Sequence, residues 1–343
     1  MWAHWWMRCT SSARRIIRLS HSGCGPAGRT KKPSLKGESI MSGLLATLRG
    51  IGTATFIVLS LFLLFFPFFL PLALIKLLVP HFRFRLGCTR AMVWVAWRWM
   101  ACIDFAMDHI ARQKIVIDNP VQNRPEARLL LISNHQSWAD ILVLIRVLAK
   151  SRLPFPRFFI KQQMIWVPII GFATWALDFP YMKRYSREQV EKNPSLKGQD
   201  LETTRRACEI YRHQPVAVIN FAEGTRSTAA KRQASGSPYK RLLKPKAGGT
   251  AFMLYAMGDV LDEVLEVAVV YRGSDNPTIW QYWCGTLPEV RAIVRPLAIP
   301  REYYGRDYQN DAEFQDSFRN WMNDYWAGKD KEIIRLHAGE AED

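Results

Sequence analysis

The sequence lacks the patterns that mark several classes of enzyme and binding module. Its six cysteines are scattered with no C-x-x-C pair, which argues against a disulfide framework or a cysteine zinc site and fits a reducing compartment. It has no G-x-S-x-G elbow, no P-loop sequence and no H-E-x-x-H motif, so it offers no obvious covalent nucleophile, nucleotide cradle or zinc site. One G-x-G-x-x-G match, GCGPAG, is rejected because no strand precedes it and no helix follows it.

Acidic residues are nearly absent from residues 1–40, which carry eight Lys or Arg and a single acid. We expect a basic disordered tail there. Two alternatives stay open: a transit peptide, because the stretch is rich in Arg and Ser, and a translation start at Met41, which would leave the tail untranslated. Removing its eight basic residues and one acid lowers the formal net charge from +17 to +10. The remainder still suits anionic partners, namely nucleic acid, anionic lipid or phosphorylated substrates.

Charge is missing altogether from residues 50–75, a 26-residue apolar run. A helix needs roughly 20 apolar residues to cross a bilayer, and Pro67 and Pro71 would kink it. We therefore expect a membrane segment over 41–82, either a transmembrane helix or a re-entrant segment; a buried soluble helix is the alternative, and a signal peptide fits worse. If translation starts at Met41, most flanking positive charges follow the run. This distribution predicts an integral membrane protein whose large C-terminal part lies on the cytoplasmic face of the inner (plasma) membrane.

Residues 83–127 follow this run with many aromatic and several charged side chains. Their Trp-rich part, 91–110, suits the headgroup layer of a membrane, and we expect an amphipathic linker at the membrane surface. A core helix of the following domain is an equal alternative. A later uncharged stretch, 164–177, is too short to span if Pro168 and Gly171 break it, and would line an apolar groove or rest on lipid.

Apolar runs and helical patterns alternate through the rest of the chain. We expect strands at the four runs 128–133, 215–221, 265–273 and 289–299, separated by helical segments, which indicates an α/β domain over 128–300 with a mixed, mostly parallel sheet flanked by helices. Residues 301–343 predict a C-terminal amphipathic helix and tail. Loops after strand ends gather the chemistry in such sheets, and NHQSWAD (134–140) and AEGTRS (222–227) both occupy such loops.

Those two loops combine a base with an anion ligand. A histidine with a carboxylate five positions on, and no serine nucleophile, suits general-base catalysis on a hydroxyl group, with the carboxylate fixing the imidazole tautomer. The plainer readings are a loop histidine and, at Asp140, a helix N-cap. In the second loop, an arginine beside a glycine suits a phosphate group. The residues thus describe a substrate alcohol that carries a nearby phosphate.

The same two loops resemble the conserved blocks of a known family. NHQSWAD is similar to the NHxxxxD block, and FAEGTRS to the FPEGTR block, of the glycerolipid acyltransferases, which include lysophosphatidic acid acyltransferases. DFPYMKR (178–184) resembles the second block of the family, and KPKAGGTAF (244–252) resembles a later stretch in its lysocardiolipin-acyltransferase-like branch. The chain departs from the pattern in two places: Ala222 replaces the proline of FPEGTR, and VAVV (267–270) lacks the proline of the fourth block.

This resemblance implies a role for each matched residue. His135 is the general base on the acceptor hydroxyl, and Asp140 orients it. The acceptor's phosphate and glycerol contact the second loop and a basic run between the two loops. These expected ligands are Glu223, Gly224, Thr225, Arg226, Lys183 and Arg184, with Lys161, Lys244 and Lys246 as weaker candidates. Two plainer readings remain: Arg226 forms a structural ion pair with Glu223, and Lys183 and Arg184 face anionic headgroups.

The resemblance also implies the substrates and partners. The donor is an acyl thioester of coenzyme A or of acyl carrier protein, no cofactor or metal is needed, and the membrane supplies a lysophospholipid acceptor. The expected acceptor is 1-acyl-glycerol-3-phosphate; lysocardiolipin, lysophosphatidylglycerol and glycerol 3-phosphate are alternatives. A non-catalytic membrane scaffold and a nucleic-acid binder are alternatives of other classes, and we expect no nucleic-acid partner because the chain has no recognised binding module. The sequence does not indicate an oligomeric state.

Overall fold

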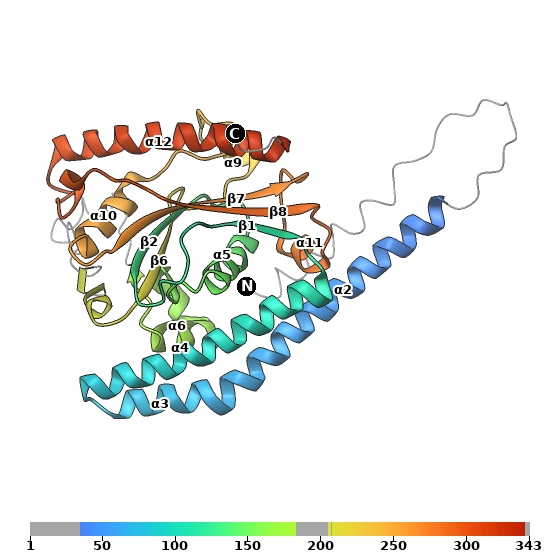
Figure 1. Ribbon diagram of the computed structural model, residues 1–343, viewed down its shortest axis with the longest axis horizontal. Coiled ribbons are helices and arrows are strands. Elements are labelled where there is room, and N and C mark those ends of the chain that lie inside the picture. Colours follow the sequence, from blue (N-terminus) through green and yellow to red (C-terminus); the bar gives the residue numbers. More distant parts are fainter. Residues whose placement is uncertain (1–34, 183–204, 207, 340–343) are drawn as a thin grey trace, which may run out of the picture. The chain divides into compact units, whose positions relative to one another are not determined.

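A six-stranded sheet in the order β1-β8-β7-β2-β6-β3 lies at the centre of the unit formed by residues 43–343 (Figure 1). The computed structural model describes residues 35–182, 205–206 and 208–339. Neighbouring strands are parallel throughout this sheet, except that β7 and β8 are antiparallel. The strands are β1 (Ile115–Asp118), β2 (Arg128–Ser133), β3 (Pro156–Phe158), β6 (Val216–Phe221), β7 (Glu263–Arg272) and β8 (Glu289–Pro296). A separate parallel pair joins β4 (Ile160–Lys161) to β5 (Tyr181–Met182).

The continuous apolar sequence of the central strands reflects cover on both faces of the sheet. In β2, Leu129 and Leu131 belong to one buried cluster, whereas Leu130 and Ile132 belong to another on the opposite face. A strand covered on both sides loses the apolar–polar alternation of a half-exposed strand. The expected fold class, an α/β domain with a mixed and mostly parallel sheet preceded by an apolar helix, is confirmed.

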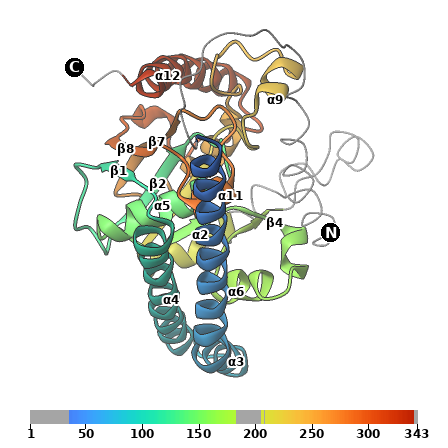
Figure 2. The same cartoon turned by 90° about the vertical axis from the view of Figure 1, so that its right-hand side faces the viewer.

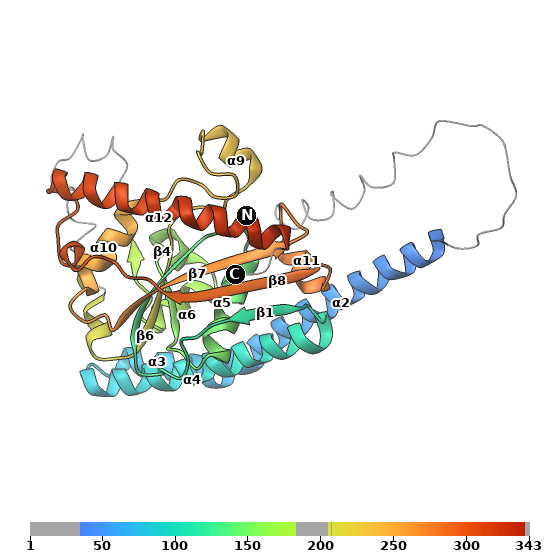
Figure 3. The same ribbon diagram turned by 45° about the horizontal axis from the view of Figure 1, so that its top comes forward.

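Helices cover the two faces of the sheet. Figure 1 shows α10 and α12 on one side and α5 on the other, and Figure 3 shows α12 running above β7 and β8. The helices of this part are α5 (Ala139–Lys150), α6 (Ile170–Ala176), α9 (Ala229–Ala234), α10 (Ala247–Met257), α11 (Ile279–Cys284) and α12 (Ala312–Ala338). Short turns of 3₁₀-helix lie at η3 (Gln162–Trp166), η5 (Glu209–Arg212) and η6 (Arg301–Tyr303).

The apolar run near the start of the chain forms one long helical element that turns back on itself. Helix α2 (Leu35–Leu64) passes through a π-helical segment, η1 (Phe65–Phe69), into α3 (Leu70–Leu78). Helix α4 (Phe82–Phe105) then returns beside it and ends in a second π-helical segment, η2 (Ala106–Ala111) (Figures 1 and 2). Pro67 falls inside η1, where the missing N–H of a proline is accommodated by the altered hydrogen bonding.

One face of this long element contacts the rest of the unit along its length. Its buried positions recur every three to five residues, close to the spacing of a single helix face: Gly50, Thr53, Ile57, Ser60, Phe65, Phe69, Ala73 and Lys76. At Gly50 the side chains of Cys284 and Trp280 in α11 lie directly against the backbone. The opposite face is apolar and exposed, and it includes Leu59, Leu63, Phe66, Phe68, Leu74 and Leu77.

The sheet extends beyond the domain limits that we expected from the sequence. Strand β1 pairs with β8 and lies within 83–127, the expected linker, so the sheet begins before residue 128. Helix α12 buries Phe318 and Trp326 in the same core cluster as β6 and β7, so the C-terminal helix is part of the domain. Of the expected tail 1–40, residues 1–34 lie outside the described part of the chain.

Candidate active site

Two loops meet where the parallel strands β2 and β6 end at the same edge of the sheet. The register pairs Ser133 with Phe221, the last residues of the two strands, so the loops that follow start side by side. The first loop carries His135 and leads into α5, and the second carries Glu223 to Ser227. Two backbone hydrogen bonds join the loops: Ala222 donates to the carbonyl of Ser133 at 3.2 Å, and Ser227 donates to the carbonyl of His135 at 2.6 Å.

The first of these hydrogen bonds explains one departure from the family pattern. Ala222 stands where the pattern has proline, and its N–H is the donor to Ser133. A proline has no N–H to donate. The second departure, VAVV in place of a proline block, lies inside β7, which pairs on both edges with β2 and β8. A proline within a strand that pairs on both sides removes a ladder hydrogen bond.

The His135 ring is fixed on two sides. Its Nδ1 lies 2.8 Å from Oδ2 of Asp140, and the ring stacks on Phe221 with a centroid distance of 4.0 Å and an angle of 18°. Donation of Nδ1–H to the carboxylate leaves the lone pair on Nε2, the atom that takes a proton in general-base catalysis. The side chain is 12% exposed, so the ring is largely shielded from water but still accessible.

Asp140 is completely buried in the first turn of α5, and Trp138 occupies the N-cap position of that helix. Besides the imidazole, its Oδ2 accepts the backbone N–H groups of Gln136 at 2.6 Å and Ser137 at 2.9 Å. The carboxylate therefore shapes the loop and orients the ring at once. The plain N-cap reading of Asp140 is wrong, because the hydrogen bonds that it accepts come from its own loop and the cap position belongs to another residue.

Glu223 points into the protein rather than toward a substrate. Its side chain is buried, with Oε1 accepting the backbone N–H of His135 at 2.8 Å and Oε2 accepting that of Leu243 at 2.7 Å. Burial raises the pKa of Glu223 to about 8 from an ordinary value of 4.5, against the opposing effect of these two hydrogen bonds. Glu223 thus fastens three segments together. Both of its oxygens are engaged by backbone groups rather than by Arg226, the plainer reading, and its expected contact with the acceptor stays a prediction.

Gly224 and Thr225 are exposed at the tip of the second loop, and the following Arg226 is half-buried. Gly224 has a φ of +67°, a backbone conformation that favours glycine, and the flexible side chain of Lys246 lies against it. The Arg226 guanidinium lies 4.8 Å above the ring of Trp138, which follows His135 by three residues. This stacking brings the arginine to the first loop.

Two lysines place further positive charge on this tip. Lys231 donates to the hydroxyl of Thr225 at 2.7 Å and to the carbonyl of Arg226 at 3.1 Å. Lys246, expected only as a weaker candidate, lies against Gly224, and its own N–H donates to the carbonyl of Ala222 at 2.7 Å. Between Glu223 and Asp259 the sequence has no acidic residue. The loop tip is therefore a concentration of positive charge.

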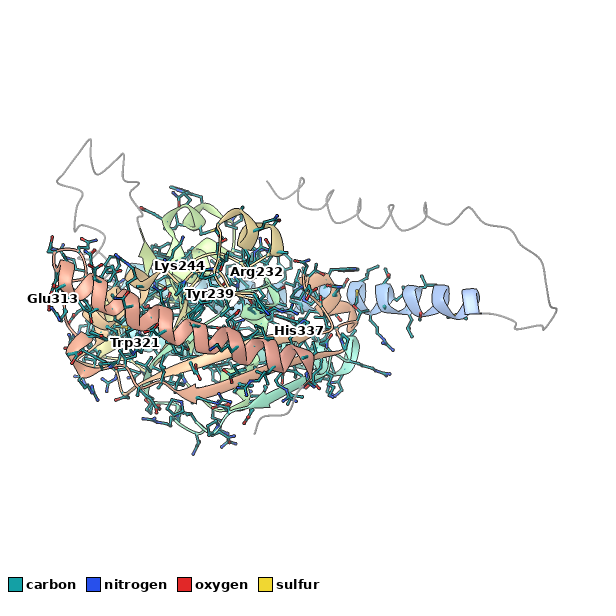
Figure 4. The ribbon with its side chains drawn as sticks, turned by 90° about the horizontal axis from the view of Figure 1, so that it is seen from above. Arg232, Tyr239, Lys244, Glu313, Trp321 and His337 are labelled. Carbon is teal, nitrogen blue, oxygen red and sulfur yellow. The ribbon has the colours of Figure 1, made fainter. Side chains whose placement is uncertain are left out.

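Helix α12 supports the segment that carries Lys244 and Lys246. The Tyr239 hydroxyl donates to the backbone carbonyl of Asn323, and Figure 4 shows Tyr239 and Lys244 beside this helix. The carboxylate of Asp330 accepts three consecutive backbone N–H groups, those of residues 240, 241 and 242. Lys244 is exposed. Of the other expected phosphate ligands, Lys183 and Arg184 lie outside the described residues, as does the side chain of Lys161.

Two residues of this site were missed by the sequence reasoning. The side-chain amide of Asn134 pairs with both backbone groups of Val269, accepting its N–H and donating to its carbonyl, each at 2.9 Å. It thereby extends the ladder between β2 and β7 by one side chain. The second missed residue is Tyr271, whose hydroxyl donates to Asp140 at 2.5 Å. Asn134 was detectable as the polar residue that ends an apolar run, whereas nothing local marks Tyr271.

Comparisons with known proteins agree with this arrangement. A family model described as Acyltransferase matches residues 114–270. A mouse (Mus musculus) protein, 1-acyl-sn-glycerol-3-phosphate acyltransferase epsilon, is 21% identical over 230 residues, which cover 61% of this chain and 58% of that protein. The chain therefore aligns with less than two thirds of this relative's length.

The chain also has a partial likeness to the solved structure of the 1-acyl-sn-glycerophosphate (LPA) acyltransferase PlsC from Thermotoga maritima. It is 14% identical, with a TM-score of 0.44 over 84% of this chain and 98% of that one. The matched segment 114–270 contains β1, both loops and nearly all of β7. Residues 114–270, a little under half of the chain, match the Acyltransferase family model, and these comparisons support the predicted glycerolipid acyltransferase family.

Proposed function

We propose that this protein is a membrane-bound O-acyltransferase that moves an acyl chain from a thioester to the free hydroxyl of a lysophospholipid, with 1-acyl-glycerol-3-phosphate as the acceptor. The observation that carries the proposal is the 2.8 Å contact between His135 and a buried carboxylate, beside a loop tip that gathers three cations. A base and an anion site at this spacing suit one small molecule that carries both an alcohol and a phosphate.

The chemistry needs no group beyond these residues and the two substrates. Nε2 of His135 takes the proton of the acceptor hydroxyl as its oxygen attacks the thioester carbonyl, and Asp140 stabilises the imidazolium that forms. The C–S bond then breaks, and the departing thiolate receives the proton from the imidazolium. The products are an ester and a free thiol, and His135 returns to its neutral form. A thiolate leaves readily, so no acyl-enzyme is required.

The cations at the loop tip favour an acceptor with a phosphate monoester. A monoester carries about −1.5 to −2 charges at neutral pH, whereas a diester carries one. Lys231 and Lys246 lie against Gly224, Thr225 and Arg226, three consecutive residues of the loop, and no acidic residue occurs between Glu223 and Asp259. Lysophosphatidic acid meets this charge better than lysophosphatidylglycerol or lysocardiolipin, which present diesters.

The helical element α2–η1–α3 supports membrane association. Residues 41–78 form the one helix in the described part of the chain that is long and apolar enough to cross a bilayer. One face of it packs on the domain from Gly50 to Lys76, and the other is apolar and exposed. A helix that contacts its own domain along most of its length cannot also cross the bilayer away from that domain. We therefore favour insertion into one leaflet over a full span, with the domain on the cytoplasmic face.

Purified protein in vesicles, given a panel of lysolipids and acyl thioesters of coenzyme A and of acyl carrier protein, tests the reaction. We expect the highest kcat/KM with lysophosphatidic acid. His135→Ala lowers kcat by about a thousandfold, because general-base catalysis is worth about 10²–10⁴. His109→Ala is the matched control, since His109 is an exposed histidine on η2. Transfer that survives in His135→Ala, or a wild type that acylates no lysolipid, contradicts the proposal.

The acceptor site is tested separately by Lys231→Met. We expect KM for lysophosphatidic acid to rise about tenfold, as loss of one charge-assisted contact of about 1.4 kcal/mol implies. The control is Lys240→Met. Lys240 is also exposed, and its backbone N–H, not its side chain, donates the hydrogen bond to Asp330 of α12. Its KM stays within about twofold of wild type. Equal effects of the two variants would indicate a diffuse surface attraction instead of a site.

A further inference from the structure

Strand β7 continues beyond the end of its neighbour β2. The register places Ser133, the last residue of β2, opposite Val267, whereas β7 runs on to Arg272. Side chains alternate along a strand, so Val267, Val269 and Tyr271 face the same side of the sheet. All three belong to the core cluster that also contains buried residues of α5. The extra length of β7 therefore carries Tyr271 to the first turn of α5.

There the Tyr271 hydroxyl meets the carboxylate that orients the catalytic base. It donates to Oδ1 of Asp140 at 2.5 Å, and both side chains are completely buried. The other carboxylate oxygen, Oδ2, accepts from the His135 ring and from two backbone N–H groups of the loop. Oδ2 thus accepts hydrogen bonds from the imidazole and its loop, whereas Oδ1 accepts the one from Tyr271.

The hydroxyl must be the donor in this pair. Burial raises the pKa of Tyr271 well above its usual value, and the charge of Asp140 raises it further, so the phenol keeps its proton. A hydrogen bond donated to a carboxylate spreads its negative charge and weakens its pull on any other proton. Tyr271 and His135 therefore compete for the charge of Asp140.

We propose that Tyr271 is a positioning residue, the third member of a chain His135–Asp140–Tyr271, which limits how strongly Asp140 holds the imidazolium form of His135. The proposal rests on the proposed function in one respect, that His135 is the general base. Without the hydroxyl, the charge of Asp140 acts on His135 undiminished, and the ring keeps its proton to a higher pH. The neutral base then becomes available only in more alkaline solution.

Other charged groups around His135 stay unchanged in the test. Glu223 accepts the His135 backbone N–H, Arg226 stacks on Trp138 in the same loop, and Tyr282 adds to the electrostatic surroundings of Tyr271. Glu223 itself titrates near pH 8, so it contributes to the pH profile of every variant alike. A difference between wild type and a Tyr271 variant therefore reports on the hydroxyl.

The test is Tyr271→Phe with Tyr282→Phe as its matched control. Tyr282 is equally buried in the same cluster, but its hydroxyl lies 3.4 Å from Arg146 and contacts neither His135 nor Asp140. The full-length protein is titrated by NMR of its labelled histidines, and His135 is assigned by its loss in His135→Ala. We expect the His135 midpoint to rise by about one pH unit in Tyr271→Phe and by less than about 0.2 in the control.

Turnover gives a second readout. The acid limb of the kcat–pH profile should move upward by the same amount in Tyr271→Phe, with acceptor KM within about twofold of wild type. A His135 midpoint that does not move overturns the proposal. So does a midpoint that moves equally in Tyr282→Phe, because the shift would then come from the loss of packing that both variants share. The NMR titration needs no turnover, so failure of the acyl-transfer proposal remains distinguishable from failure of this one.

A second pair of variants keeps the test decisive if the phenylalanine protein does not fold. Tyr271→Gln retains an N–H donor, whereas Tyr271→Met has a similar size and no donor. We expect a lower His135 midpoint in the glutamine variant than in the methionine variant. Equal midpoints in the two proteins would also overturn the proposal.

Discussion

The active edge and the N-terminal helical element are stabilised in opposite ways. At the edge, the buried carboxylate of Asp140 accepts two backbone N–H groups of its own loop, and that of Glu223 accepts one from each of two other segments. The helical element is held mainly by apolar contacts along one face, such as that of Phe65 with Phe172, with few polar ties. Directional bonds fix the geometry that chemistry needs, whereas apolar contacts leave a surface that suits a fluid partner such as lipid.

Of the predicted substitutions, removal of the Glu223 side chain should lower the stability of the protein most. Glu223→Ala leaves the N–H groups of His135 and Leu243 buried without partners, at about 1–3 kcal/mol each. We expect the free energy of unfolding to fall by about 4 kcal/mol, measured by denaturant titration in detergent. Activity should fall with it, because both loops lose their common attachment.

Phe66→Ala in the helical element is the control for that measurement. Phe66 is 49% exposed on the apolar face, so we expect less than about 0.5 kcal/mol of change in unfolding but weaker partition into lipid vesicles. If Phe66→Ala destabilises the fold as much as Glu223→Ala does, the contrast between the two regions is wrong.

The main polar tie of the helical element should give the next largest effect. Lys76 lies 2.7 Å from Asp178 and is nearly buried, and the Thr89 hydroxyl donates to the same carboxylate. Asp178→Asn keeps the shape but leaves a buried cation unpaired, at about 3 kcal/mol. The double variant Lys76→Met, Asp178→Asn should recover most of this loss in thermal unfolding. If the double variant is no more stable than the single one, charge is not the cause.

The smallest of the predicted effects is a difference between the two regions in how their stability depends on pH. The pKa of Glu223 is raised to about 8 in the folded protein, so folding favours its protonated form. This contribution is complete below the ordinary value of 4.5 and is lost as the pH rises through 8. Between pH 6 and pH 8 we expect a loss of about 2 kcal/mol. Glu223→Gln, which cannot titrate, should show a flatter profile than wild type, and parallel profiles would contradict the assignment.

Much of the fold followed from the sequence because its signals are local. Four apolar runs gave β2, β6, β7 and β8, and the NHQSWAD loop was placed correctly at the end of a strand. Strands β1 and β3 are four and three residues long, too short to show a period, and their existence depends on partners far along the chain. To predict these two strands, one would have needed to know which strands of the sheet they pair with.

The residues of the site were predicted better than the directions in which their side chains point. His135 and Asp140 are five residues apart, so their contact was a local inference. Glu223 lies next to Gly224 in the sequence, yet one points inward and the other forms the exposed tip, and no local pattern distinguishes the two. Tyr271 is 131 residues from Asp140, and its role depends on how far β7 extends.

Gly50 carries a consequence for how the apolar helix is attached. A single methyl group added there would meet the sulfur of Cys284 at 2.5 Å and the ring of Trp280 at 3.0 Å. A contact below 3 Å requires a shift of the Cys284 side chain or of one of the two helices, so Gly50→Ala should weaken the packing of α2 against α11. The packing of the long apolar helix on α11 thus depends, in part, on an atom that the sequence omits.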